Sequence, residues 1–314
     1  MKVSVLQENL AHGLSIVARA VSPRSTLPVL ANILVATDEG RLRLSATNLE
    51  LGITCWIGAK IEEEGSTTVP ARTFTDLVST LPSDRMDISL NIRTQTLNVR
   101  SSSSNTDIKC IDAQEFPPMP VPDLGEAILI NVSDLKEMIQ QVVFAASSDE
   151  ARPVLTGVYL TAQDNRISMQ AADGFRLSVR HAELSSPVPH PVKAIIPARA
   201  LSELARVASD GDQMVSMAIL PARGQVIFHM KDIELASQLI DGTYPDLEQV
   251  IPRTTQTRSV LSTNAFLKAC KQAESWPSCA GWGAHPTSRK LFQTGLNRSG
   301  GEAEGVEFNC DHGV

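Results

Sequence analysis

The spacing of apolar residues along the first hundred positions changes between a helical and a strand period. Residues 8–21 carry apolar side chains three or four positions apart, which predicts a helix with one apolar face. These side chains are Leu10, Leu14, Val17 and Val21. Residues 41–46 and 96–100 instead alternate apolar and polar side chains, which predicts strands that are buried on one side.

A second helix is predicted to begin at Pro70, because proline is tolerated in the first turn of a helix. Its apolar stripe consists of Phe74, Leu77, Val78 and Leu81. Strand patterns dominate the sequence between and after the two helices. The pattern therefore predicts an α+β fold with two helices packed on antiparallel sheets in each unit, and it excludes a wound parallel sheet.

The chain contains an internal repeat. Residues 28–48 align without gaps on residues 153–173, at an offset of 125 positions. The identical pairs are Pro28/Pro153, Val29/Val154, Leu30/Leu155, Arg41/Arg166 and Ala46/Ala171. A second match joins PARTFTDLVSTL, from Pro70, to PARALSELARVA, from Pro197, at an offset of 127. The common order and spacing indicate two similar units.

The beginnings of the units also correspond, and a third such beginning follows them. They are VSVLQENLAHGLSIVARAV from residue 3, ILINVSDLKEMIQQVVFAA from residue 128 and SVLSTNAFLKACKQAE from residue 259. Regular structure should stop in FPPMPVPD (116–123) and IPRTTQTR (251–258), because proline restricts the backbone. We therefore predict domains over residues 1–123, 126–252 and 254–314, with the third repeat incomplete.

Composition indicates a globular protein. The chain has 314 residues, 42% of them hydrophobic and 20% charged, which excludes collagen, a disordered tail and a membrane bundle. No apolar run approaches the roughly 18–20 residues of a transmembrane helix, and the amino terminus lacks the apolar core of a signal peptide. The five scattered cysteines suit a reducing compartment, so we expect a cytoplasmic protein. Because the net charge is −7, a nucleic-acid partner would require a local basic surface.

Motifs of common catalytic sites are absent from the sequence. It contains no GxxxxGK[ST], HExxH, GxSxG, paired CxxC or strand-borne GxGxxG. Its six histidines stand in unrelated sequence contexts, so none of them is an obvious general acid or base. Cys279, His285, Cys310 and His312 do not have the spacing of a usual zinc site, and we interpret them as unrelated residues. We expect no enzymatic activity, no metal and no cofactor.

Two arginines occupy equivalent positions in the repeat. Arg72 and Arg199 each follow a proline at the start of a predicted helix, where a cation is disfavoured by about 0.3–1 kcal/mol at low salt. A DNA backbone would offset this cost, because Lys and Arg contacts to phosphates release counterions. The alternative is a solvated surface arginine. Further basic candidates, each also explained as ordinary surface, are Arg19, Arg24, Lys136 and Arg152.

The segments AADGFRLSV (171–179) and LIDGTYPDLEQVIP (239–252) form a second candidate site. Gly174 indicates a turn with positive φ. Full exposure of the large apolar side chain of the neighbouring Phe175 would be unfavourable. With Leu155, Leu177, Pro245 and Val250 it could line an apolar groove for a partner peptide. The alternative is that Phe175 and Leu177 fill the core of the second unit.

Five segments of the chain resemble the beta sliding clamp family, the processivity subunits of the bacterial replicative DNA polymerase. They are RSTLPVLANILV (24–35), ATNLELG (46–52), TTVPARTFTDLVSTLP (67–82), AADGFRLSV (171–179) and LIDGTYPDLEQVIP (239–252). They occur in the order of the family and cover residues 1 to about 274. The resemblance implies repeated DNA-clamp domains, three in each subunit, and a head-to-tail homodimeric ring whose helices surround duplex DNA.

The resemblance also implies roles for particular residues. Arg24, Arg72 and Arg199 would make weak, sequence-independent contacts to DNA phosphates, and Arg152 joins them as a candidate. The pocket for peptides from polymerases, the clamp loader and repair proteins would consist of Leu155, Gly174, Phe175, Arg176, Leu177, Pro245 and Val250. Ala172 stands where the family usually has Thr, a difference that changes one polar contact of the pocket.

The resemblance stops after Glu274. The last forty residues hold two of the three tryptophans, two of the five cysteines and seven of the eighteen glycines, and they lack sustained helical or strand periodicity. We interpret this break as a changed reading frame, a truncation or a diverged tail. The third domain would then not fold properly, and the chain would be a monomer or an ill-defined oligomer that does not stay on circular DNA.

Two other functions remain as alternatives. An enzyme built from repeats would require a convergent polar pocket. An adaptor would bind partner peptides in the groove of the second unit without encircling DNA.

Overall fold

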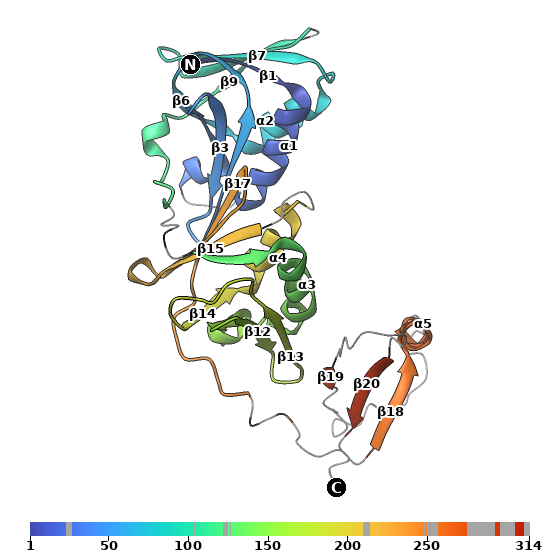
Figure 1. Cartoon of the computed structure of the whole chain (residues 1–314). Coiled ribbons are helices and arrows are strands. Elements are labelled where there is room, and N and C mark those ends of the chain that lie inside the picture. The colour runs from blue at the N-terminus through green and yellow to red at the C-terminus, as the bar shows by residue number, and fades with distance from the viewer. Residues whose placement is uncertain are drawn as a thin grey trace.

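The computed structural model describes residues 1–22, 27–102, 104–121, 125, 127–209, 214–247, 249, 251, 257–274, 293–295 and 305–310. Strands β1 to β9 and helices α1 and α2 form a first unit, and β10 to β17 with α3 and α4 form a second (Figure 1). Apart from one additional strand in the first unit, β5, the elements follow the same order in both units, as the repeat in the sequence predicts.

The first sheet lies entirely in the first unit. Its five strands have the order β5 (Lys60–Glu63), β1 (Lys2–Leu6), β7 (Arg85–Asn91), β8 (Thr96–Arg100) and β9 (Asn105–Lys109), and all neighbours are antiparallel. β8 has the predicted alternation, with Leu97 and Val99 buried between more exposed residues. β9 lies at one edge of this sheet.

The second sheet joins the two units. Its order is β10 (Ile128–Asn131), β15 (Met214–Leu220), β16 (Gln225–His229), β17 (Ile233–Gln238), β4 (Leu51–Gly58), β3 (Arg41–Thr47), β2 (Asn32–Asp38) and β6 (Ser66–Pro70). The seam is the antiparallel pairing of β17 with β4, in which Glu234 lies opposite Thr54 and Ala236 opposite Gly52. The backbone N–H of Trp56 extends the seam by donating to the carbonyl of Asp232 at 2.9 Å.

The third sheet belongs to the second unit. Its order is β13 (Leu177–Glu183), β12 (Arg166–Ala172), β11 (Gly157–Gln163) and β14 (Val192–Pro197), again antiparallel throughout. β12 is the counterpart of β3, and β13 is the counterpart of β4. Whereas β4 has a strand on each side, β13 lies at the edge of its sheet.

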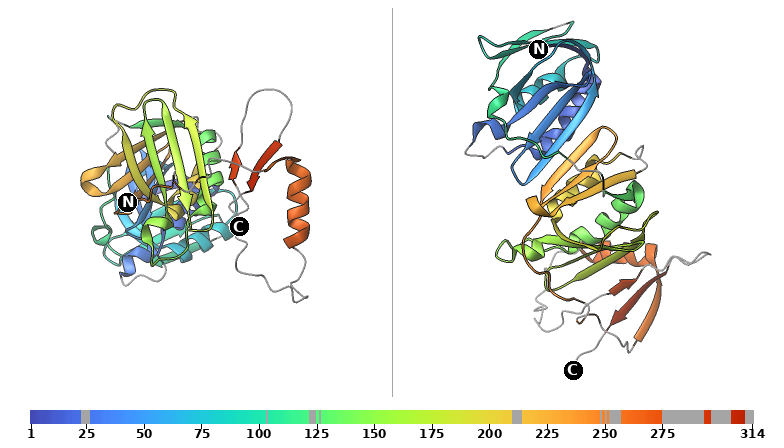
Figure 2. Two further views of the ribbon diagram at one scale, coloured as in Figure 1. Left: turned by 90° about the horizontal axis from the view of Figure 1, so that it is seen from below. Right: turned by 60° about the vertical axis from the view of Figure 1, so that its left-hand side comes forward.

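Two helices cover one face of the sheets in each unit. They are α1 (Gln7–Val17) and α2 (Ala71–Thr80) in the first unit, and α3 (Val132–Val142) and α4 (Ala198–Val207) in the second. All four lie on the same side of the connected sheets (Figures 1 and 2). The predicted helix over residues 8–21 is shorter than expected, because Ala18–Ala20 form a 3-10 turn and Val21 is extended ahead of Ser22 and Pro23.

The packed core extends through both units. Its largest fully buried side chains include Phe74, Leu10, Leu14 and Phe228, and α2 buries Phe74 and Val78 while Leu77 and Leu81 are only half-buried. The observed helices and antiparallel sheets confirm the predicted α+β fold.

The described part of the remaining chain begins as the other units do, with a strand followed by a helix. β18 (Thr257–Ser262) precedes α5 (Thr263–Glu274), and β18 pairs with β20 (Gly305–Cys310), which pairs with β19 (Gln293–Gly295). The last two strands lie where the sequence showed no sustained periodicity. The alternation in β20 spans six residues, which is too short for a pattern to stand out.

Candidate nucleic-acid interface and peptide pocket

Arg72 and Arg199 have the same local structure in the two units. Each is the second residue of its helix, after Pro70 or Pro197, and the two prolines have φ and ψ of −52° and 115° and of −51° and 129°. The Arg72 side chain is 95% exposed, and its Nε lies 3.8 Å from Asp76. Arg199 is also exposed. Both cations therefore project into solvent from the positive end of a helix dipole.

Two other basic candidates are occupied by contacts within the protein. Arg19, in the 3-10 turn after α1, donates to Glu203 of α4 at 3.1 Å and thereby links the two units. Lys136 donates to the backbone carbonyl of Ala208 at 3.2 Å. Sequence reasoning missed Arg206, in the last turn of α4, which pairs with the other oxygen of Glu203 at 3.0 Å. Its helical spacing from Glu203 was the available signal.

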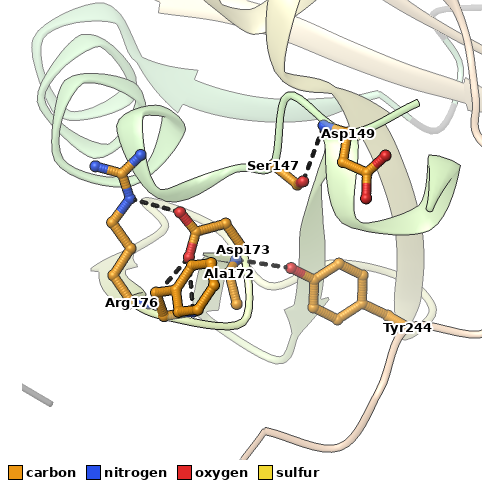
Figure 3. Close-up of polar contacts among 7 residues, drawn as sticks. Ser147, Asp149, Ala172, Asp173, Arg176 and Tyr244 are labelled. Atoms are coloured by element: carbon orange, nitrogen blue, oxygen red, sulfur yellow. Dashed lines mark hydrogen bonds and ion pairs between the residues drawn. The ribbon is translucent and has the colours of Figure 1, made fainter. Parts of the chain in front are cut away.

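Gly174 lies in a tight turn between β12 and β13. Its φ is +92°, a conformation that glycine adopts without strain. The carboxylate of Asp173 closes the turn by accepting the backbone N–H groups of Phe175 at 2.8 Å and Arg176 at 3.0 Å (Figure 3). Its other oxygen pairs with Nε of Arg176 at 2.9 Å. Burial acts to raise the pKa of Asp173, but these donors and the Arg176 charge together lower it, so the carboxylate stays ionised.

The residues around this turn form an exposed aromatic surface. Phe175 is 61% exposed, so the alternative that it fills the core is wrong. Phe144, in the 3-10 turn Val143–Ala145, is 58% exposed, and the Arg176 guanidinium lies 5.8 Å from the centroid of its ring. Leu177 and Leu155 are half-buried, and the carbonyl of Leu155 accepts the backbone N–H of Ser147 at 2.8 Å. Sequence analysis missed Phe144, which continues the apolar series of α3 and gave no separate signal.

Tyr244 fixes the segment that carries Pro245. Its hydroxyl accepts the backbone N–H of Ala172 at 3.2 Å (Figure 3). Its ring stacks on Tyr159 with centroids 5.1 Å apart. Burial raises the pKa of the Tyr244 hydroxyl, so it stays protonated. Pro245 is exposed and lines a cavity of about 550 Å³ together with the two tyrosines and His181. Ala172 therefore contributes its backbone N–H to this site.

Arg152 lies beside the Gly174 turn and not on a helix. Its Nη1 is 3.5 Å from the position that a Cβ on Gly174 would occupy, and its Nε pairs with Asp149 at 3.0 Å. The Ala151 N–H and the Arg152 side chain lower the pKa of Asp149. This placement brings Arg152 close to Gly174, whereas the sequence grouped it with the DNA contacts. Arg24 and Val250 lie outside the described residues.

A thiol and a carboxyl group are buried in the first two units. Burial raises the pKa of the Cys55 thiol to about 11, which keeps it protonated and unreactive. Burial also raises the pKa of Glu234, at the β17–β4 seam, to about 7. Among the described residues no group of three or more His, Cys, Asp or Glu side chains could hold a metal. Of the four residues weighed as zinc ligands, only Cys310 belongs to that part of the chain.

Comparison with known protein families shows which family the chain belongs to. Residues 1–120 match the model of the DNA polymerase III beta subunit N-terminal domain, and residues 129–246 match that of its central domain. The chain belongs to the beta sliding clamp family. The resemblance seen in the sequence is therefore confirmed.

Individual clamps show the extent of the similarity. The beta sliding clamp of Synechococcus elongatus is 35% identical over 275 residues, covering 87% of this chain and 73% of its own length, and that of Bacillus subtilis is 33% identical over 282 residues. The solved Bacillus subtilis clamp has a TM-score of 0.84 at 27% identity and covers 99% of this chain and 83% of its own. A Pseudomonas aeruginosa clamp bound to griselimycin has a TM-score of 0.82 at 26% identity, covering 100% of this chain and 85% of its own.

None of the helices in the described ranges is both long and apolar enough to cross a membrane.

Proposed function

We propose that this protein is a non-catalytic sliding clamp that holds a replicative DNA polymerase on duplex DNA in the cytoplasm. The observation that carries the proposal is the pair Arg72 and Arg199, which project from equivalent helix starts on the side where all four helices lie. Sliding requires contacts that do not depend on the base sequence of the DNA. Exposed arginines that face phosphates provide such contacts. Arg24 belongs to the same proposed set. The clamp domains would span residues 1–123, 126–252 and 254–314.

We assign the surface around Gly174 to partner peptides of the polymerase and the clamp loader. The residues of this proposed pocket are Leu155, Gly174, Phe175, Arg176, Leu177, Pro245 and Val250, and its position supports the addition of Arg152 and Phe144. Exposed aromatic rings beside an arginine suit the apolar and acidic side chains of a short peptide. Encirclement of DNA requires more than one copy of the chain, arranged head to tail.

Retention on DNA tests the proposal. The protein is incubated with a bacterial clamp loader, ATP and nicked circular DNA, and the complex is passed through a sizing column in high salt. Retention on the circle and its loss after the circle is cut to a linear molecule are the expected results, because a ring slides off a free end. Equal loss from both molecules would contradict the sliding function.

A second candidate function is a peptide-binding adaptor that does not encircle DNA. It is favoured by one observation, namely that the exposed rings of Phe144 and Phe175 and the Gly174 turn all belong to the second unit. A fluorescent clamp-motif peptide that binds the protein, together with no retention on nicked circles, would establish the adaptor in place of the clamp.

A further inference from the structure

A cavity lies on the face of the second sheet that is turned away from α1. Its volume is about 330 Å³, at the lower end of the roughly 300–1,000 Å³ that small-molecule sites occupy. Thr54 and Trp56 line it from β4, and Glu234 lines it from β17. Cys55, which alternates with the first two, lies against Gly13 of α1. The cavity therefore extends across the seam between the units, on the side opposite the helices.

The segment that connects the two units forms one wall of this cavity. Residues 116–121 (FPPMPV) all line it. Phe116 is buried in a small apolar cluster with Val29. Met119 lies against Gly52 of β4, where an added Cβ would come within 2.7 Å of the Met119 methyl carbon. Because proline also fixes φ, these contacts hold the segment in position and the cavity is largely pre-formed.

The Glu234 side chain makes no hydrogen bond to the described residues, although Glu234 is only 8% exposed. Nδ1 of His229 lies 3.5 Å from its Oε2 and is itself buried without a hydrogen bond in the described chain. Burial raises the pKa of Glu234 to about 7, because the lost hydration is not replaced. Both carboxyl oxygens can therefore accept N–H groups from a ligand.

Arg43 adds an unpaired donor to the same cavity. Its Nη1 lies 3.5 Å from Asp38, which also accepts the indole N–H of Trp56 at 2.7 Å. Its Nε is buried and has no hydrogen-bond partner among the residues that the structure describes. The Arg43 charge acts against burial in setting the pKa of Glu234, so the two side chains lie within electrostatic reach of each other.

The charges around the cavity favour a neutral ligand. A cation would be repelled by Arg43, and an anion would be repelled by Glu234. A neutral ligand that offers N–H donors to the carboxylate and a carbonyl oxygen to the guanidinium satisfies both groups. The Trp56 ring and the prolines of residues 116–121 add flat apolar surface, which suits a planar ring system.

We propose that this cavity binds the guanine base of a small nucleoside ligand, with its N–H donors on Glu234 and its carbonyl oxygen on Arg43. The N1–H and N2–H groups of guanine are adjacent, so they match the two oxygens of one carboxylate. O6 lies next to N1–H and is a good acceptor for arginine. The site is separate from the proposed DNA contacts, which lie on the helix side, and it does not depend on the proposed clamp activity.

Quenching of Trp56 fluorescence by guanosine tests the site. Trp276→Phe and Trp282→Phe in the full-length chain leave Trp56 as the single tryptophan. The titration is made at pH 8, above the pKa of about 7 of Glu234, so that the carboxylate is ionised. Saturable quenching by guanosine is expected. Inosine, which lacks only the exocyclic amine, should bind about tenfold more weakly, and adenosine more weakly still.

Two substitutions in the cavity separate the proposed contacts. Glu234→Gln should weaken guanosine binding by about tenfold or more and abolish the preference over inosine, because an amide has one acceptor oxygen. Arg43→Lys keeps the charge but removes Nε, and it should weaken guanosine and inosine alike. Glu63→Gln, at an exposed position on β5, is the matched control and should bind guanosine as the parent protein does.

Unfolding curves of each variant distinguish a lost contact from a lost fold. The Arg43 side chain is 38% exposed, so Arg43→Lys should remain folded and tests the cavity even if Glu234→Gln does not fold. Three results would overturn the proposal. They are no quenching by guanosine up to its solubility limit, equal binding of guanosine, inosine and adenosine, and unchanged guanosine binding by a folded Glu234→Gln or Arg43→Lys protein.

Discussion

Asn48 and Asp173, which are 125 positions apart, accept the same pair of backbone hydrogen bonds in their two units. Each side chain accepts the N–H groups of the residues two and three positions further on. The residue between is Leu49 in the first unit, with φ +76°, and Gly174 in the second, with φ +92°. The same turn is thus built with an unstrained glycine beside the proposed pocket and with a strained leucine in the first unit.

Gly174→Ala should destabilise the protein by about 1 kcal/mol, because an L-residue is disfavoured at this positive φ. It should also weaken binding of a clamp-motif peptide, since the turn positions Phe175 and Arg176. Denaturant unfolding and fluorescence anisotropy measure the two effects. Gly40→Ala, also at positive φ with open space around it, should share the loss of stability but keep peptide affinity. A Gly174→Ala protein with normal affinity would show that the turn does not shape the pocket.

Leu49→Asn should have the opposite effect on stability. Asn adopts the left-handed conformation more readily than Leu, and the Leu49 side chain is exposed, so little packing is lost. The free energy of unfolding should rise by about 0.5–1 kcal/mol. Leu129→Asn, an exposed leucine in β10, is the control and should give no such rise. If Leu49→Asn instead lowers stability, the leucine has a packing role that outweighs its backbone strain.

Tyr244→Phe should cost about 1–2 kcal/mol of stability, because the buried N–H of Ala172 would lose its partner. The ring stack with Tyr159 would remain. Tyr159→Phe is a matched control, since it removes a hydroxyl that makes no hydrogen bond to the described residues and keeps the same stack. Equal unfolding free energies for the two variants would show that the Tyr244 hydroxyl contributes nothing.

The repeat and the local patterns made much of the fold predictable, but they did not predict contacts between distant segments. Pattern and repeat predicted the helices, the alternating strands and the equivalence of Arg72 and Arg199, because each depends on local spacing. The β17–β4 seam was not predicted, since local alternation does not specify which distant strand is a partner. The proximity of Arg152 to Gly174 was likewise hidden, because it depends on how a turn folds back on the sheet.

Arg72→Glu and Arg199→Glu should each weaken DNA binding at low salt and reduce the slope of log K against log salt by about 1, because each removes one phosphate contact. Binding to duplexes of different sequence should fall equally. Arg223→Glu, an exposed arginine in the turn between β15 and β16, changes the net charge by the same amount and is the control. If all three variants lose affinity alike, the effect is one of total charge and not of the helix starts.

The stability of the seam between the units should depend on pH through Glu234. Burial raises its pKa from 4.5 to about 7 against the opposing effect of Arg43, and His229 on β16 lies 3.5 Å away. Because the folded protein then holds the proton more tightly than the unfolded chain, this group favours folding below about pH 4.5. Its contribution falls as the pH rises towards 7, with a slope of at most about 1.4 kcal/mol per pH unit, and is constant above that.

Glu234→Gln removes this titration and keeps a side chain of the same shape at the seam. Unfolding free energies measured from pH 5 to pH 8 should fall less steeply with rising pH than those of the parent protein, and the two curves should diverge most between pH 5 and pH 7. Glu63→Gln, at an exposed position on β5, should leave the curve unchanged. Parallel curves for the parent and Glu234→Gln would mean that the carboxyl is already ionised at pH 5. The contact between β17 and β4 would then hold a charge that Arg43 stabilises, and the seam would be insensitive to pH in this range.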